Sequence, residues 1–109
     1  MTAAADELGA RLRPLLPRGV EEKRMFGGLG FLIAGNMAIG TTAAGDLLVR
    51  ADPAREAETL AIPGAYRMMM GERAMKGFIA VDAGALAEDI VLRGWVERGV
   101  AFARTLPAK

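Results

Sequence analysis

The feature that most constrains the fold is a run of strand-forming residues that glycines interrupt, Arg24-Met25-Phe26-Gly27-Gly28-Leu29-Gly30-Phe31. A glycine inside a strand usually marks a bulge, a sharp bend, or a place where another backbone or a ligand comes close. The run therefore predicts two strands joined at a bend. A structural role for Gly27, Gly28 and Gly30 is favoured, either a bulge or close packing against a helix. The approach of a ligand or partner at these glycines stays open as the alternative.

The same glycines do not match the glycine-rich loops that bind phosphate groups. Gly28-Leu29-Gly30 is followed by Phe31-Leu32-Ile33, so the third glycine of a dinucleotide fingerprint is missing and no helix pattern begins there. No Lys-Ser or Lys-Thr pair follows at P-loop spacing. The pattern is that of a strand and not of a phosphate loop.

The remaining chain alternates helix and strand signals. A helix is expected from a cap at Thr2 to a kink or end at Pro14, a second from Asp52-Pro53 to Pro63-Gly64, and a third from a cap at Asp89. Strands are expected over residues 20–26, 29–33, 37–39, 47–50, 66–70 and 76–81. Gly35-Asn36 is expected to be a two-residue hairpin turn.

These signals predict one domain over residues 1–109 with an α+β fold, in the order α-ββββ-α-ββ-α. The sheet is expected to be antiparallel, with about five to six strands and helices packed on it. The apolar side of the last helix is expected to include Val91 and Trp95 and to close the core.

The chain contains no cysteine and no histidine, and its formal net charge is +1. Disulfides, thiol nucleophiles, the usual zinc sites and every imidazole-based relay are therefore excluded. No carboxylate pair has a recognisable catalytic spacing. We expect no enzyme activity, no catalytic residue, no metal and no cofactor.

Basic and methionine residues supply the other candidate features. The candidate binding residues are Arg24, Gly27, Gly28, Gly30, Arg67, Arg73 and Lys76. Isolated solvated side chains are the favoured interpretation of the basic residues, with convergence on one anion-binding patch as the alternative. Met68, Met69, Met70 and Met75 suit either an irregular core or an adaptable partner surface. Strand alternation predicts that Met69 faces away from Met68 and Met70.

Several segments resemble the N-terminal domain of the TfoX (Sxy) family of bacterial competence regulators. They are Lys23 to Phe31, Gly35-Asn36-Met37-Ala38, Leu47-Leu48-Val49-Arg50, Met75-Lys76-Gly77-Phe78 and Leu92-Arg93-Gly94-Trp95-Val96. The resemblance implies a compact α+β domain with an antiparallel sheet and no established catalysis. Longer family members carry a second, C-terminal domain, so this chain is expected to be a stand-alone single-domain member.

We therefore expect a non-enzymatic regulatory or protein-interaction domain that takes part in transcription regulation in the bacterial cytoplasm. Its expected partner is another protein, and a homodimer is left open. No apolar run approaches the ~20 residues that span a membrane, and no secretory signal pattern begins the chain, so no membrane association is expected. A small-anion or nucleotide-binding module around Arg24, Arg67, Arg73 and Lys76 is one alternative. Direct nucleic-acid binding is the other.

Overall fold

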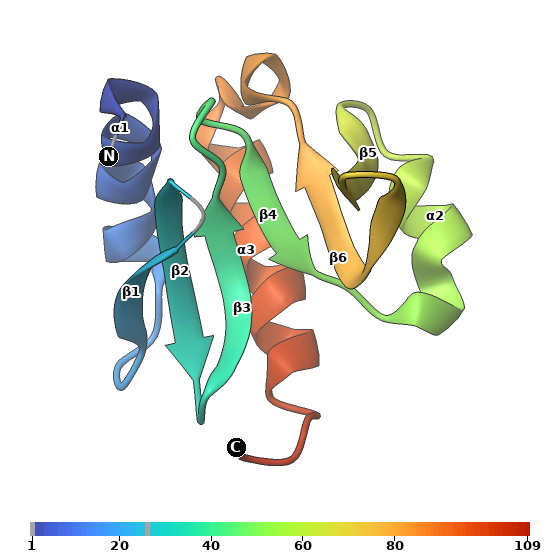
Figure 1. Ribbon diagram of the computed structural model, residues 1–109. Coiled ribbons are helices and arrows are strands. Elements are labelled where there is room, and N and C mark those ends of the chain that lie inside the picture. The colour runs from blue at the N-terminus through green and yellow to red at the C-terminus, as the bar shows by residue number, and fades with distance from the viewer. Residues whose placement is uncertain (1, 26) are drawn as a thin grey trace.

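A computed structural model describes residues 2–25 and 27–109, and in these residues the chain forms a six-stranded antiparallel sheet with helices packed on it (Figure 1). The elements in chain order are α1 (Ala3–Leu12), the 3-10 turn η1 (Arg13–Leu15), β1 (Glu21–Met25), β2 (Gly28–Ile33), β3 (Asn36–Thr41), β4 (Leu47–Arg50), the 3-10 turn η2 (Pro53–Arg55), α2 (Glu56–Leu60), β5 (Ala65–Met70), β6 (Arg73–Val81), the 3-10 turn η3 (Ala83–Leu86) and α3 (Asp89–Ala103). The predicted α+β class and the order α-ββββ-α-ββ-α are confirmed.

The strand order in the sheet is β1-β2-β3-β4-β6-β5. The first four strands form the expected meander, in which each strand pairs with the next. The last two strands form a hairpin, and β6 lies between β5 and β4. Consequently β1 and β5 are the two edge strands of the sheet.

The hairpin turn between β2 and β3 is one residue earlier than predicted. Ile33 pairs with Asn36, so Ala34 and Gly35 are the two turn residues, with φ values of 50° and 83°. Two successive positive φ values are typical of a turn that matches the twist of the flanking strands. Asn36 begins β3 instead, where it is buried and its Nδ2 donates a hydrogen bond to the carbonyl oxygen of Pro107 at 2.9 Å.

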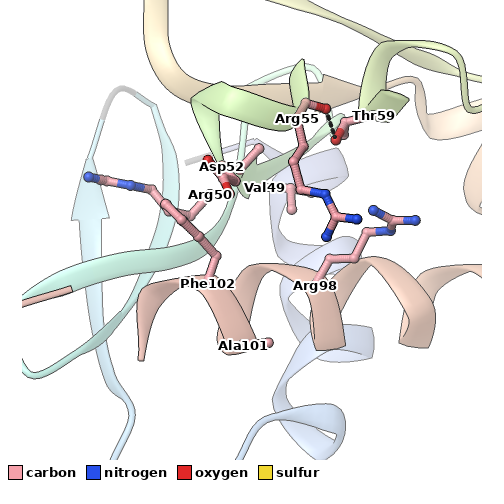
Figure 2. Close-up of a pocket in the computed structure, with 9 residues that line it drawn as sticks. Val49, Arg50, Asp52, Arg55, Thr59, Arg98, Ala101 and Phe102 are labelled. Carbon is pink, nitrogen blue, oxygen red and sulfur yellow. Dashed lines mark hydrogen bonds between the residues drawn. The ribbon is translucent and has the colours of Figure 1, made fainter. Parts of the chain in front are cut away.

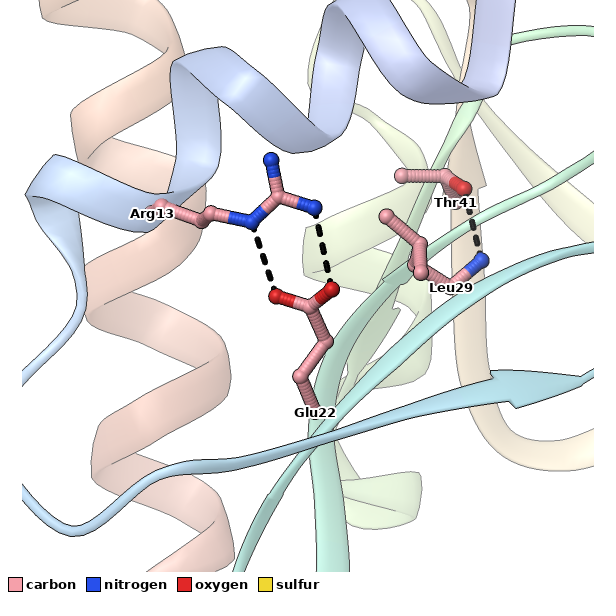
Figure 3. Close-up of polar contacts among 4 residues, drawn as sticks. All are labelled: Arg13, Glu22, Leu29 and Thr41. Atoms are coloured by element: carbon pink, nitrogen blue, oxygen red, sulfur yellow. Dashed lines mark hydrogen bonds and ion pairs between the residues drawn. The ribbon is translucent and has the colours of Figure 1, made fainter.

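The glycine cluster at the start of β2 has the close-packing role expected of it, but against neighbouring strands and not against a helix. A Cβ atom at Gly28 would overlap the main-chain carbonyl of Thr41 in β3. Next to it, the Leu29 N–H donates a hydrogen bond to Thr41 Oγ1 at 3.0 Å (Figure 3). Gly27 has φ +77° and lies directly before β2. Phe26, the expected last residue of the first strand, lies outside the described residues.

A helix cap begins α1, and an ion pair joins the residue after α1 to β1. Thr2 caps α1, because its side chain accepts a hydrogen bond from the Ala5 N–H at 3.1 Å. After α1 ends, Arg13 Nε and Nη2 donate to the two carboxylate oxygens of Glu22 in β1 at 2.8 and 2.9 Å (Figure 3). This bidentate hydrogen bonding raises the pKa of Arg13 and lowers the pKa of Glu22.

The main core lies between the sheet and the two longer helices, α1 and α3. Its buried members include Leu12 of α1, Phe31 of β2 and Trp95 of α3, and the core position predicted for Trp95 is confirmed. Two details of α3 differ from the prediction. Val91 is 37% exposed and lies off the buried side. Asp89 is the first helical residue and not the cap, and one of its oxygens lies 3.1 Å from Arg11 Nη2.

No helix in residues 2–25 and 27–109 is long and apolar enough to cross a membrane.

Candidate functional site

The β5–β6 hairpin bends sharply near its middle. Arg67 pairs with Ile79 and Met69 pairs with Ala74, so only residue 68 of β5 lies opposite residues 75–78 of β6. Gly77 is one of the extra residues of β6 at this point. Its φ of +79° is a conformation that favours glycine. The distal half of the hairpin therefore turns out of the sheet, as the curled ribbon between β5 and β6 shows (Figure 1).

The bend brings methionine side chains onto the sheet face that α1 and α3 leave open. A second apolar cluster forms there, separate from the main core, and its buried members are Leu32, Met37, Leu48, Phe78 and Ala80. Met25, Met68 and Met75 are partly buried and pack against it. Thioether side chains suit this role because they are flexible and fill irregular spaces.

A hollow of about 220 Å³ remains between this hairpin and strands β3 and β4. We call it the methionine hollow, and its lining residues are Thr41, Thr42, Leu48, Met68, Met69, Met70 and Met75. Met69 and Met70 are 46% and 51% exposed at the hollow. The two threonine oxygens already accept hydrogen bonds from main-chain N–H groups at Leu29 and Asp46. The surface offered to a ligand is therefore mainly thioether and methyl groups, which can accept an apolar side chain.

Strict strand alternation predicted that Met69 would face away from Met68 and Met70. All three residues line the methionine hollow, and Met69 and Met70 are both exposed. The pairing is irregular between Arg67 and Met69, so strand alternation is interrupted at Met68, whereas Met69 and Met70 pair regularly with Ala74 and Arg73. The partner-surface interpretation of the methionines thus gains a geometric basis that the sequence does not carry.

The base of the hairpin is anchored by polar contacts around Asp46. The Tyr66 hydroxyl donates a hydrogen bond to Asp46 Oδ2, and the Ala83 N–H donates to Asp46 Oδ1 at 2.9 Å. Desolvation raises the pKa of Tyr66 to about 12, with the hydrogen bond to Asp46 adding to the shift. These contacts join β5, the β3–β4 turn and η3, and so hold the hairpin base in place.

The basic candidates separate into two groups. Arg67, Arg73 and Lys76 lie on the β5–β6 hairpin, whereas Arg24 is exposed on β1 at the opposite edge of the sheet. Arg67 forms an ion pair with Glu56 of α2. Within residues 2–25 and 27–109, no ion pair is found for Arg73 or Lys76.

The candidate glycines lie with Arg24 and not with the hairpin. The side of Gly30 where a Cβ would project is filled by the sulfur atoms of Met25 and Met37, at 2.8 and 3.1 Å from that position. Gly28 approaches β3 with similar closeness. The seven candidate residues are therefore not gathered in one pocket. Arg67, Arg73 and Lys76 share the hairpin with the methionines of the hollow but do not line it.

Sequence reasoning missed a second hollow, of about 230 Å³, in which Arg55 and Arg98 lie toward one another (Figure 2). Arg55 is the last residue of η2, directly before α2, and Arg98 lies in α3. The two residues are far apart in the sequence, so no local pattern or spacing connects them. Only the tertiary packing of these elements could reveal the pair. No group of three or more His, Cys, Asp or Glu side chains that could hold a metal ion occurs in the described part of the chain.

Comparison with known families identifies the chain over most of its length. The family model described as the TfoX N-terminal domain matches residues 11–103, which include every strand, the methionine hollow and α3. No match was found among curated proteins or among solved structures. The chain belongs to the TfoX N-terminal domain family.

Proposed function

We propose that this chain is a non-enzymatic regulatory domain that acts by binding another protein through the methionine hollow. The observation that carries the proposal is the exposure of Met69 and Met70 beside an apolar hollow. Exposed methionines of this kind form surfaces that adapt to a partner's side chains. Membership in the TfoX N-terminal domain family supports a competence-regulator-like role.

The chemistry around the hollow specifies the kind of partner. The hollow accepts an apolar side chain, and its volume of about 220 Å³ suits one anchor residue and not a whole helix face. Arg73 and Lys76 on the same hairpin are exposed cations. The proposed partner segment therefore carries an apolar anchor flanked by acidic residues, which the two cations attract.

The absence of histidine and cysteine from the chain supports a binding role over catalysis. The side chains that line the hollow are threonine, leucine and methionine, none of which exchanges protons near neutral pH. A general acid or base for catalysis would have to come from elsewhere.

A comparative capture experiment tests the proposal. Tagged wild-type domain and the variants Met69→Glu and Met70→Glu are used to recover proteins from the source cell's extract. Ile90→Glu is the matched control, because Ile90 is an exposed apolar residue, 76% accessible, in α3. We expect a specific partner to bind the wild type and the control and to be lost with both methionine variants. Recovery of the same proteins by all four baits would contradict the proposal.

A second measurement addresses the charges and the alternative of self-association. The double substitution Arg73→Glu and Lys76→Glu is expected to slow association with the recovered partner and to reverse the effect of salt on the association rate, because like charges then repel. Arg18→Glu is the control, since Arg18 is exposed in the loop before β1. Sedimentation of the isolated domain completes the test. A wild-type dimer that the methionine variants abolish would assign the hollow to a second copy and contradict the proposal of a different protein.

A further inference from the structure

The second hollow lies on the side of the sheet that the helices cover. Its lining comes from the end of β4, from the segment of η2 and α2, and from the C-terminal half of α3. Its apolar surface includes Val49, Ala101 and Phe102. The cavity of about 230 Å³ is smaller than the roughly 300–1,000 Å³ of sites for drug-sized ligands. It therefore suits a small molecule.

Two guanidinium groups face one another at this hollow. The side chains of Arg55 and Arg98 extend toward each other (Figure 2). Arg50 also lines the hollow, but its guanidinium is directed away from the other two and lies 4.7 Å from the centroid of the Phe78 ring. Both guanidinium groups are exposed, so solvent screens their mutual repulsion, and an anion placed between them would contact both. The two guanidinium groups can therefore donate hydrogen bonds to one anion from opposite sides.

Two carboxylates, Glu58 and Asp52, lie near these cations and compensate part of their positive charge. Arg55 Nε lies 3.3 Å from Glu58, but both side chains are about 70% exposed, so solvent screens the pair. Asp52 Oδ1 accepts the Ala54 N–H at 2.9 Å and is used as a cap for η2. For Arg98, no ion pair is found among residues 2–25 and 27–109. Its guanidinium instead lies 5.8 Å from the centroid of Trp95.

We propose that Arg55 and Arg98 bind the phosphate group of a small phosphorylated molecule whose apolar part lies against Phe102. Guanidinium groups donate paired, charge-assisted hydrogen bonds to phosphate oxygens, and two facing arginines can hold opposite sides of one phosphate. The apolar lining distinguishes such a ligand from free phosphate. This site is separate from the methionine hollow and does not depend on the function proposed for it.

Phenyl phosphate and inorganic phosphate are suitable probes, and isothermal titration calorimetry at constant ionic strength gives their affinities. We expect phenyl phosphate to bind more tightly than inorganic phosphate, and benzyl alcohol not to bind. Arg98→Gln is expected to weaken phenyl phosphate binding about tenfold or more, because a charged hydrogen-bonding partner is removed. Arg98→Lys is expected to restore only part of the affinity, because an ammonium cannot bind in the bidentate manner.

Arg93→Gln is the matched control, since Arg93 is exposed on the same helix and does not line the hollow. Circular dichroism establishes that each variant is folded. Unchanged affinity for Arg93→Gln together with the loss for Arg98→Gln supports the proposal. Equal weakening by both substitutions would show nonspecific attraction by net charge and overturn it. The proposal is also overturned if phenyl phosphate does not bind at millimolar concentration, or if only single-stranded nucleic acid binds.

Discussion

Two glycines of α3 make opposite predictions for the same substitution. A Cβ atom at Gly99 would overlap the main-chain oxygen of Ala38 in β3 and would lie 2.9 Å from Ile39 Cδ1. A Cβ at Gly94 would meet no atom within 4 Å. Both residues are interior positions of Asp89–Ala103. Alanine is therefore expected to stabilise the domain at one position and to destabilise it at the other.

The magnitudes follow from helix propensity and packing. Replacing a helical glycine by alanine gains about 0.8–1 kcal/mol, and Gly94→Ala is expected to show this whole gain. Gly99→Ala has the same propensity gain, but α3 must move away from β3 because a strand backbone cannot rotate aside. Overpacking of this kind costs about 1–3 kcal/mol. Since the propensity gain is common to both variants, their difference in unfolding free energy measures the packing cost directly.

Urea unfolding followed by circular dichroism is the assay. We expect Gly94→Ala to raise the denaturation midpoint, and Gly99→Ala to lie about 1–3 kcal/mol below it with an unchanged slope. Thermal unfolding should separate the two variants by at least about 4 °C. If Gly99→Ala were as stable as Gly94→Ala, the close approach of α3 to β3 would be wrong.

Three further predictions concern pH and the hairpin bend. The hydrogen bonds from Arg13 lower the pKa of Glu22, so the ion pair stabilises the fold fully above the ordinary pKa of 4.5 and loses this contribution as the pH falls through the lowered pKa. Glu22→Gln should therefore reduce the loss of stability in acid, which is measured by urea midpoints at about pH 3 and pH 7. The pKa of Tyr66 is raised to about 12, so its contribution to stability is complete below pH 10 and is lost as the pH rises through 12. Tyr66→Phe should remove this loss of stability at alkaline pH. Absorbance titration of the phenol checks the pKa. Gly77→Ala should cost about 1–2 kcal/mol because of its positive φ, and should speed hydrogen exchange in the distal hairpin. Unchanged exchange there would contradict the role given to the bend.

Local signals in the sequence were sufficient for most of the fold. Thr2 and Asp52 each accept a hydrogen bond from a main-chain N–H at a helix start, where their residue types predicted caps. The turn between β2 and β3 lies at Ala34-Gly35, one residue before the predicted Gly35-Asn36. The prediction rests on asparagine's tolerance of positive φ, whereas alanine has no such preference. Tertiary packing decided that position, and Asn36 instead bonds to Pro107.

The candidate site was predictable only in part. The run of methionines was visible in the sequence, but the hollow it lines depends on the three additional residues by which β6 exceeds β5 at the bend. Gly77 gave a local hint of that bend, whereas the pairing that creates it is long-range. Arg55 and Arg98 could not be connected at all, since their proximity follows from the packing of α3 against the sheet.

The methionine hollow is the centre of the proposed function, and the affinity of the captured partner for three forms of the domain tests it most directly. Titration calorimetry would compare the wild type with Met69→Glu and with Ile90→Glu. Because a charge placed in an apolar contact removes an anchor interaction, we expect Met69→Glu to weaken binding about tenfold or more and Ile90→Glu to leave it unchanged. Equal affinities for Met69→Glu and the wild type would contradict the proposal that the partner binds at the methionine hollow.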